Sequence, residues 1–215
     1  MLLSDKILLA NTDILDRMLE HRFVADIQAD RLERDVFHRY LAYEGHFVET
    51  AISIFAFATI GAPDINARRW LIGVQDALAN KQVPYFEDIF SRRGIMVETH
   101  VPDAVSAFDV GMLNIARTGA FVDVLTAMFA AEWMYWTWSK ATDTRQISDP
   151  DLRVWVDMHT ATDFADQAMW LKNAIDTYSD ESDADRLSGV FNTVTQLEIE
   201  FHSAAYHSPP KHKGS

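Results

Sequence analysis

Residues 37–55, FHRYLAYEGHFVETAISIF, place an apolar side chain at almost every helical turn. The stripe advances by alternating steps of four and three residues, through Phe37, Leu41, Glu44, Val48, Ala51 and Phe55. An α-helix has about 3.6 residues per turn, so these positions share one face, which packs against a core. The pattern predicts one long helix from about Leu32 to about Thr59, with Glu44 as the single charged member of its core face.

The same helical period recurs along the rest of the chain, between residues that typically begin or end helices. Thr12 and Asp64 are expected to cap helices, the first running to about Phe23. Further helices are predicted to open at Pro84 and close at Gly94, and to cover 103–119, 121–141, a segment starting at Asp149–Pro150, and about 185–206. A loop is expected over Ile95–Val101. The prediction is an all-α multi-helix bundle, a single domain over 1–207 with a flexible C-terminal tail at 208–215.

Composition excludes several classes of protein. The 215-residue chain has 48% hydrophobic residues, enough for a large core, and a formal net charge of −13. Nucleic acid and anionic membranes are poor partners for such a chain, because both present negative phosphate groups. The sequence has no cysteine, so it has neither disulfides nor a thiolate nucleophile. No apolar run has the length of a membrane span and no signal segment is evident, so a cytoplasmic location is expected.

Three carboxylates stand where the helical pattern calls for apolar residues. Glu44 interrupts the stripe above, and Glu132 interrupts that of Leu125, Met128 and Tyr135. Glu198 interrupts the seam of Leu187, Phe191, Val194, Phe201 and Ala205. Burying a carboxylate costs several kcal/mol unless it is paired, hydrogen-bonded or protonated. One such residue is usually a satisfied buried acid, but three on separate helices predict a shared polar pocket.

Aromatic residues cluster near these acids. Tyr40, Tyr43 and Phe47 flank Glu44, and residues 133–138 are aromatic or apolar nearly all round. Aromatic rings beside buried acids suit a flat, nitrogen-rich heterocycle, because rings stack on it and carboxylates bind its N–H groups. Taken alone, the aromatics indicate only core packing.

His159 and Asp163 form a further pair, four residues apart. They share a helix face if the helix that starts at Pro150 continues so far. That spacing can hold a metal ion, although an ordinary hydrogen bond between the two side chains is the more common use.

Several segments resemble the TenA/thiaminase-II family, which has the heme-oxygenase-like fold. The resemblance covers roughly residues 8 to 207 and rests on the order and spacing of five segments. These are Val36–Leu41 with Glu44 and Phe47; Phe108 and Gly111–Leu113 with Arg117 and Gly119; Phe129–Tyr135; Trp155–Val156 with His159 and Phe164; and Leu197–Phe201 with Ala204–Tyr206. The chain departs from the family at its catalytic cysteine, which falls on Ala131, and is similar to a branch that lacks this cysteine and depends on glutamate.

The resemblance implies an enzyme of thiamin salvage that hydrolyses an aminopyrimidine without a cofactor and forms a dimer or tetramer. Glu44 would bind the amino group and ring nitrogen, and Glu198 would act as general acid and base. Glu132, one position beyond the cysteine site, would serve as a base or carboxylate nucleophile. The other expected pocket residues are Tyr43, Phe47, Phe108, Ala131, Tyr135 and His159.

Two other functions remain open at this point. One is a di-metal oxidase of the same fold, with Glu44, Glu132, His159 and Asp163 as ligands. Those oxidases carry histidines at the positions of Ala51 and Asp166, and Ala51 cannot bind a metal. The other is a non-catalytic pyrimidine-binding or regulatory protein, since family members are often labelled transcriptional activators. The net charge of −13 argues against direct contact with DNA.

Overall fold

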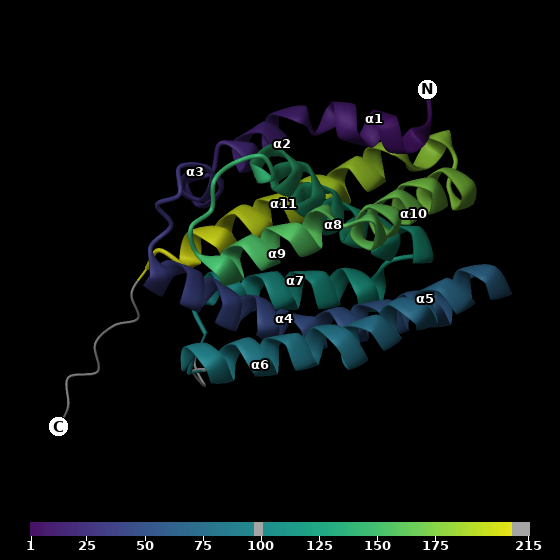
Figure 1. Cartoon of the computed structure of the whole chain (residues 1–215). Helices are drawn as coiled ribbons and strands as arrows, with labels where there is room; N and C mark the ends of the chain where they lie inside the picture. The colour runs from purple at the N-terminus through teal and green to yellow at the C-terminus, as the bar shows by residue number, and fades with distance from the viewer. Residues whose placement is uncertain (97–100, 208–215) are drawn as a thin grey trace.

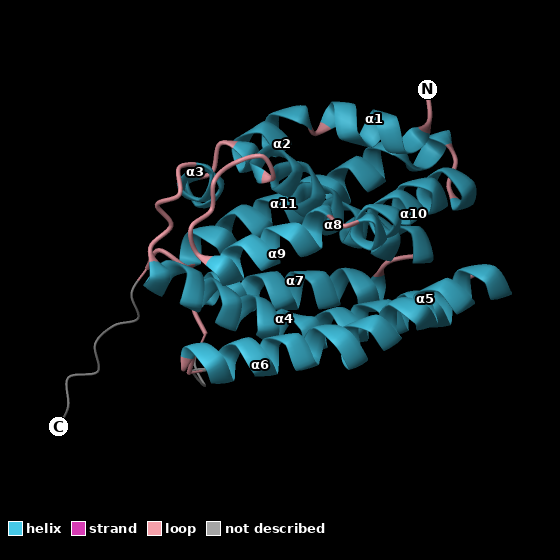
Figure 2. Ribbon diagram, in the orientation of Figure 1, coloured by secondary structure: helices cyan, strands magenta, loops and turns pink. Residues whose placement is uncertain are grey.

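The regular elements are all helices in the computed structural model, which describes residues 1–96 and 101–207 (Figures 1 and 2). No strand occurs within these two ranges. The predicted all-α bundle is thus confirmed. Of the predicted loop at Ile95–Val101, Ile95 and Met96 are non-helical, and residues 97–100 lie outside the described part. The predicted tail at 208–215 lies outside it as well.

Four long helices form the core of the bundle: α4 (Arg34–Gly61), α7 (Asp103–Thr118), α8 (Phe121–Thr142) and α11 (Ala184–Ala204). Helix α8 packs on the other three and is buried on almost every side. Its apolar sequence follows from that position, because no face is left for polar side chains. No helix in the described ranges combines the length and apolar character needed to cross a lipid bilayer.

The N-terminal segment is three short helices, α1 (Leu3–Ala10), α2 (Thr12–Leu19) and α3 (Arg22–Gln28). The predicted helix does begin at Thr12, but it ends at Leu19 instead of at about Phe23, and α1 precedes it. Thr12 does not cap α2, because its hydroxyl donates backward to the Leu9 carbonyl at 3.0 Å. His21 ends the predicted stretch by capping α3, where its Nδ1 accepts from the Phe23 amide at 3.1 Å.

Helices α5 (Ile65–Ala77) and α6 (Val83–Arg93) form one continuous rod through a π-helical segment, η1 (Leu78–Gln82). Asp64 caps α5 and Gly94 closes α6 with a φ of 64°, both as predicted. Pro84 stands in the first turn of α6, as predicted, but α6 continues directly from η1 instead of following a loop. The Pro84 ring has no N–H and crowds the carbonyl four residues back, and a wider turn relieves that conflict.

Helices α9 (Pro150–Thr160) and α10 (Thr162–Tyr178) pack on α8 and lead through the short η2 (Glu181–Asp183) into α11. The Asp149 side chain caps α9, and Arg93 of α6 holds its first turn through Asp151, with Nε 2.6 Å from Oδ2. The chain breaks at Ala161, between α9 and α10. His159 and Asp163 consequently lie on different helices, so the condition for a shared face, one helix continuing through both, is not met.

Candidate active site

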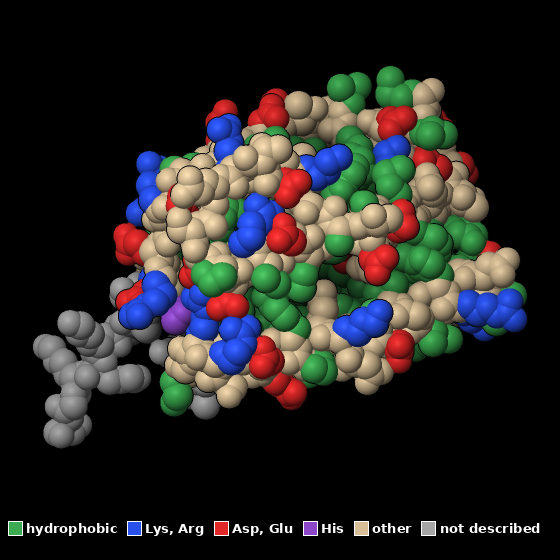
Figure 3. Space-filling model, in the orientation of Figure 1, with side chains coloured by type: hydrophobic (Ala, Val, Ile, Leu, Met, Phe, Trp, Pro, Cys, Tyr) green, Lys and Arg blue, Asp and Glu red, His purple; other side chains and the backbone are tan. Residues whose placement is uncertain are grey.

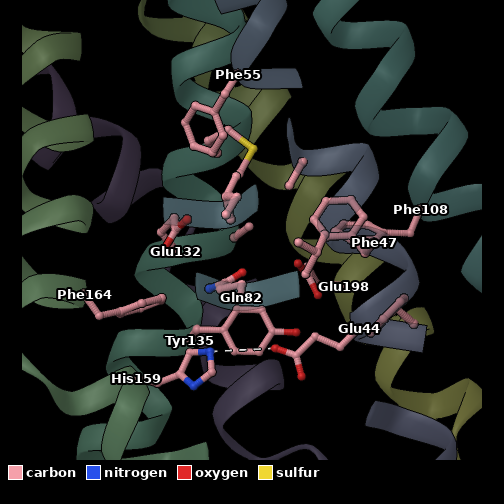
Figure 4. Close-up of a pocket in the computed structure, with 16 residues that line it drawn as sticks. Glu44, Phe47, Phe55, Gln82, Phe108, Glu132, Tyr135, His159, Phe164 and Glu198 are labelled. Carbon is pink, nitrogen blue, oxygen red and sulfur yellow. Dashed lines mark ion pairs between the residues drawn. The ribbon is translucent and has the colours of Figure 1, made fainter. Parts of the chain in front are cut away.

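A cavity of about 70 Å³ lies where α4, η1, α7, α8, α9, α10 and α11 meet (Figure 4). Its wall is mostly aromatic and aliphatic, and three carboxylates are set into it. No lysine or arginine is among the residues that line it. The lining residues are Glu44, Phe47, Val48, Ala51, Phe55, Leu78, Gln82, Phe108, Met128, Ala131, Glu132, Tyr135, His159, Phe164, Glu198 and Phe201.

Glu44 reaches the cavity from the middle of α4 and is held there by α9. Its Oε2 accepts a 2.7 Å hydrogen bond from the indole Nε1 of Trp155. Its Oε1 lies 3.8 Å from Nε2 of His159. Burial raises the pKa of Glu44 to about 8, and the hydrogen bonds from Trp155 and Tyr40 offset only part of that shift. A carboxyl group with this pKa is mostly protonated at neutral pH, so it can donate as well as accept a hydrogen bond.

His159 faces Glu44 as a neutral ring. Its Nδ1 donates to the Trp155 carbonyl at 2.8 Å, which leaves Nε2 as an acceptor pointing toward Glu44. Burial lowers the pKa of His159 to about 4. The ring of Tyr135 stacks on His159 with centroids 5.2 Å apart, and the hydroxyls of Tyr135 and Tyr40 share a 2.8 Å hydrogen bond. This end of the cavity therefore offers both donors and acceptors to a ring nitrogen and its amino group.

Glu198 projects into the cavity from α11 and is 1% exposed. Burial raises the pKa of Glu198 well above the usual value, and the nearby Glu44 and Glu132 carboxylates raise it further. Its Oε2 has no hydrogen-bond partner among the described residues. His202 lies one turn on, with Nδ1 bonded to the Glu198 carbonyl at 2.7 Å. A desolvated carboxyl with a free oxygen is suited to moving a proton near neutral pH.

Glu132 enters the cavity from α8. Its Oε1 accepts a 2.6 Å hydrogen bond from Nε2 of Gln167 on α10. Its Oε2 is buried and has no partner in the described structure. Burial raises the pKa of Glu132 to about 7, and the bond from Gln167 lowers it only in part. Ala131, beside it, presents a methyl group where a cysteine thiol would stand in the resemblance described above.

Aromatic rings form the wall next to Glu198. Phe47 and Phe108 lie with their centroids 4.4 Å apart, and Phe108 contacts Phe201 at 5.2 Å. Phe164 of α10 closes the side next to His159, with ring centroids 4.8 Å apart. Such a wall excludes water and favours a flat aromatic ligand.

Most of the site residues expected from the sequence line this one cavity, and two do not. Tyr43 lies one residue around α4 from Glu44, and its ring packs on Phe201 with centroids 6.2 Å apart instead of lining the cavity. Asp163 lines a separate surface groove with Arg69 and Trp70. The alternative metal set is therefore not assembled, and the described residues contain no group of three His, Asp or Glu side chains placed to hold a metal ion.

Three residues important to the site were missed. Leu78 and Gln82 line the cavity from η1, and Gln167 bonds to Glu132. Only Pro84, inside an otherwise helical pattern, signalled an irregular turn near Gln82. Trp155 belongs to a segment that carries the resemblance, but its bond to Glu44 was not predicted. The partners of Trp155 and Gln167 lie 111 and 35 residues away in the sequence, so neither bond is visible in one helix alone.

Comparison with known proteins shows the family. Residues 10–208 match the model of the TENA/THI-4/PQQC family. A curated relative is the aminopyrimidine aminohydrolase of Halalkalibacterium halodurans, which is 25% identical over 195 residues, covering 86% of this chain and 87% of that protein.

Solved structures share the fold. The TenA homologue of Pyrococcus horikoshii OT3 superimposes with a TM-score of 0.89 at 20% identity, covering 96% of this chain and 99% of the other. The TenA homologue of Pyrococcus furiosus gives 0.84 at 20% identity, covering 95% and 100%. The resemblance found in the sequence is thus confirmed over almost its whole length, and the chain belongs to the TENA/THI-4/PQQC family.

Proposed function

We propose that this chain is a hydrolase of thiamin salvage that acts on an aminopyrimidine without a cysteine nucleophile. In the proposed reaction the bond between the pyrimidine's exocyclic methylene carbon and its amine nitrogen breaks, and a water oxygen takes the nitrogen's place. The amine leaves with one proton taken from the enzyme, and the attacking water gives one proton back to the enzyme. The observation that carries the proposal is one desolvated cavity holding three carboxylates and an aromatic wall.

Glu44 binds the ring in this proposal. A protonated Glu44 donates to a ring nitrogen while its carbonyl oxygen accepts from the ring's amino group, a two-point contact that fixes the ring's orientation. The Trp155 N–H holds the carboxyl in place at 2.7 Å. Phe47 and Phe108, whose centroids lie 4.4 Å apart, form an aromatic wall on one side of the ring, and the neutral His159 avoids a charge clash with a basic heterocycle.

Glu198 moves the protons in this proposal. Its raised pKa keeps the acid form available at neutral pH, so it can protonate the departing amine. The carboxylate that remains then accepts a proton from the attacking water. The relative named as an aminopyrimidine aminohydrolase supports this class of reaction. Ala131 removes the thiolate route, and Glu132 is the nearest chain neighbour that can act as a base.

The test compares Glu198→Gln with Glu200→Gln, an exposed glutamate two residues along α11. We expect Glu198→Gln to lower kcat on 5-aminomethyl-4-aminopyrimidine by at least about 100-fold, since one proton donor contributes about 10²–10⁴-fold. Binding of the hydroxymethyl product, measured by calorimetry, should stay within about threefold, because Gln keeps the shape and hydrogen-bonding capacity of Glu. Glu200→Gln should behave as wild type. Turnover retained by Glu198→Gln refutes the assignment.

The same measurements separate an enzyme from a binding protein. Wild-type protein that binds the pyrimidine and releases no ammonia is a non-catalytic pyrimidine-binding or regulatory protein. The expected homo-oligomer and cytoplasmic location stay predictions alongside this proposal.

A further inference from the structure

Glu132 is a buried carboxylate with one oxygen unused. Gln167 occupies Oε1, and Oε2 has no hydrogen-bond partner in the described structure. An unpaired buried acceptor destabilises the protein, and a ligand that donates to it removes that cost. Figure 4 shows Glu132 and Glu44 on opposite sides of the cavity, with Tyr135 and Gln82 between them. A substituent that extends across the cavity from a ring bound to Glu44 would reach Glu132.

The cavity is too small to enclose a substituted pyrimidine completely. It holds about 70 Å³, whereas an apolar cavity of roughly 150 Å³ holds one benzene ring. Gln82 lines the cavity and is also exposed to solvent, so its side chain lies at an opening. The surface is hollowed between the α9–α10 layer and the rod of α5 and α6 (Figure 3).

A surface groove lies directly outside Glu132. Gln167, whose amide bonds to Glu132, also lines this groove, so one side chain separates groove and cavity. The groove holds about 340 Å³ and runs between α5 and α10. Trp70 forms its aromatic wall and is fixed by stacking on Trp170, with centroids 3.6 Å apart. Asp163 and Asp166 outnumber the one cation, Arg69, among the described groove residues.

The buried carboxylate acceptor suits the N–H of an amine, and the aromatic wall with two carboxylates in the groove suits an ammonium group carried further out on that amine. We propose that Glu132 and Gln167 form a subsite for the leaving amine, continued outward by Trp70, Asp163 and Asp166. The chain then accepts pyrimidines whose leaving amine carries a further cationic substituent. This inference rests on the proposed function, in which Glu44 binds the pyrimidine ring. The subsite binds the remaining part of that substrate, the leaving amine.

The first test compares the aminomethyl pyrimidine with the neutral hydroxymethyl pyrimidine in Glu132→Gln. Calorimetry is expected to show about tenfold weaker binding of the amine and a change within about twofold for the alcohol, since only a charge-assisted contact is lost. Gln167→Leu, which leaves Glu132 itself intact, should show the same selective loss to a smaller degree. Equal losses for amine and alcohol, in protein whose thermal unfolding is unchanged, would falsify the subsite.

The second test uses an N-(2-aminoethyl) derivative of the aminomethyl pyrimidine. The double variant Asp163→Asn/Asp166→Asn should lower the preference for this derivative over the unsubstituted amine by about three- to tenfold. Asp13→Asn/Asp16→Asn on α2 removes the same charge from exposed residues elsewhere and should leave the preference unchanged. An equal effect of both double variants, or none, overturns the groove's role. Selective binding without turnover in wild type instead refutes the proposed hydrolysis and leaves the subsite standing.

Discussion

At the scale of single residues, the site depends on how each buried carboxyl group is held. Trp155 holds Glu44 and Gln167 holds Glu132 through one oxygen each, whereas Glu198 Oε2 has no hydrogen-bond partner in the described structure and lies 3.6 Å from Nδ1 of His202. An acid held by a donor is fixed in one orientation, as a binding group must be. The oxygens of Glu198 and Glu132 that accept no hydrogen bond can exchange protons or accept a bond from a ligand.

Trp155→Phe tests this distinction. Removing the indole N–H leaves Glu44 Oε2 buried without its 2.7 Å donor. We expect pyrimidine affinity to fall about tenfold and the free energy of unfolding to fall by about 1–3 kcal/mol. Calorimetry and urea denaturation measure the two effects. Trp138→Phe is the matched control, because Trp138 stacks on Trp155 and its Nε1 has no partner in the described structure. Equal loss of affinity in both variants would show that only ring packing matters.

The sequence predicted which carboxylates face inward, because a charge in an apolar stripe is visible in one helix alone. Glu44, Glu132 and Glu198 all line the cavity, while their catalytic and binding roles stay predictions. Tyr43 shows the limit of this reasoning. It lies next to Glu44 in sequence, but neighbouring helical residues point about 100° apart, so only one of the two lines the cavity.

At the scale of elements, the rod of α5, η1 and α6 closes one side of the cavity through Leu78 and Gln82, which stand at the two ends of η1. The π-helical segment adds a residue to one turn and rotates the residues after it relative to a regular helix. Hydrophobic period identifies helices but not one wide turn within them, which is why the sequence predicted the start of α6 but not its continuity with α5.

Pro84→Ala tests the role of that turn. Alanine restores an N–H that can bond four residues back, so the rod should become more regular and its unfolding temperature should rise by a few degrees. Losing the extra residue of the wide turn would change the angle at which Gln82 faces the cavity, and KM for the aminopyrimidine should rise about three- to tenfold. Pro63→Ala, in the loop before α5, controls for the substitution itself. An unchanged KM in a stabilised Pro84→Ala protein contradicts a role for the wide turn.

At the scale of the whole molecule, buried titratable groups set how stability depends on pH. Burial raises the pKa of Glu44 to about 8 and that of Glu132 to about 7, and lowers that of His159 to about 4 and of His202 to about 3. Above pH 4.5 the buried acids of the folded protein hold more protons than they do in the unfolded chain. Below pH 6.5 the buried histidines hold fewer. Between these pH values the two groups therefore have opposite effects on how stability changes with pH.

Above pH 6.5 only the acids contribute, so stability should fall as pH rises toward 8. Each such acid contributes a slope of up to about 1.4 kcal/mol per pH unit. Urea denaturation between pH 6.5 and pH 8.5 measures the slope, and Glu44→Gln should reduce it by about the share of one group. Glu200→Gln, at an exposed position, should not change it. A wild-type slope of zero or rising stability over this range rules out the linkage.

Three acidic side chains facing one small space also share whatever hydrogen ions that space contains. The charge state of each depends on the other two, so titration belongs to the trio and not to any single member. A basic ligand that enters the cavity brings protons with it or displaces them. Its binding is therefore linked to proton uptake or release, and the fraction of occupied cavities depends on the pH of the solution.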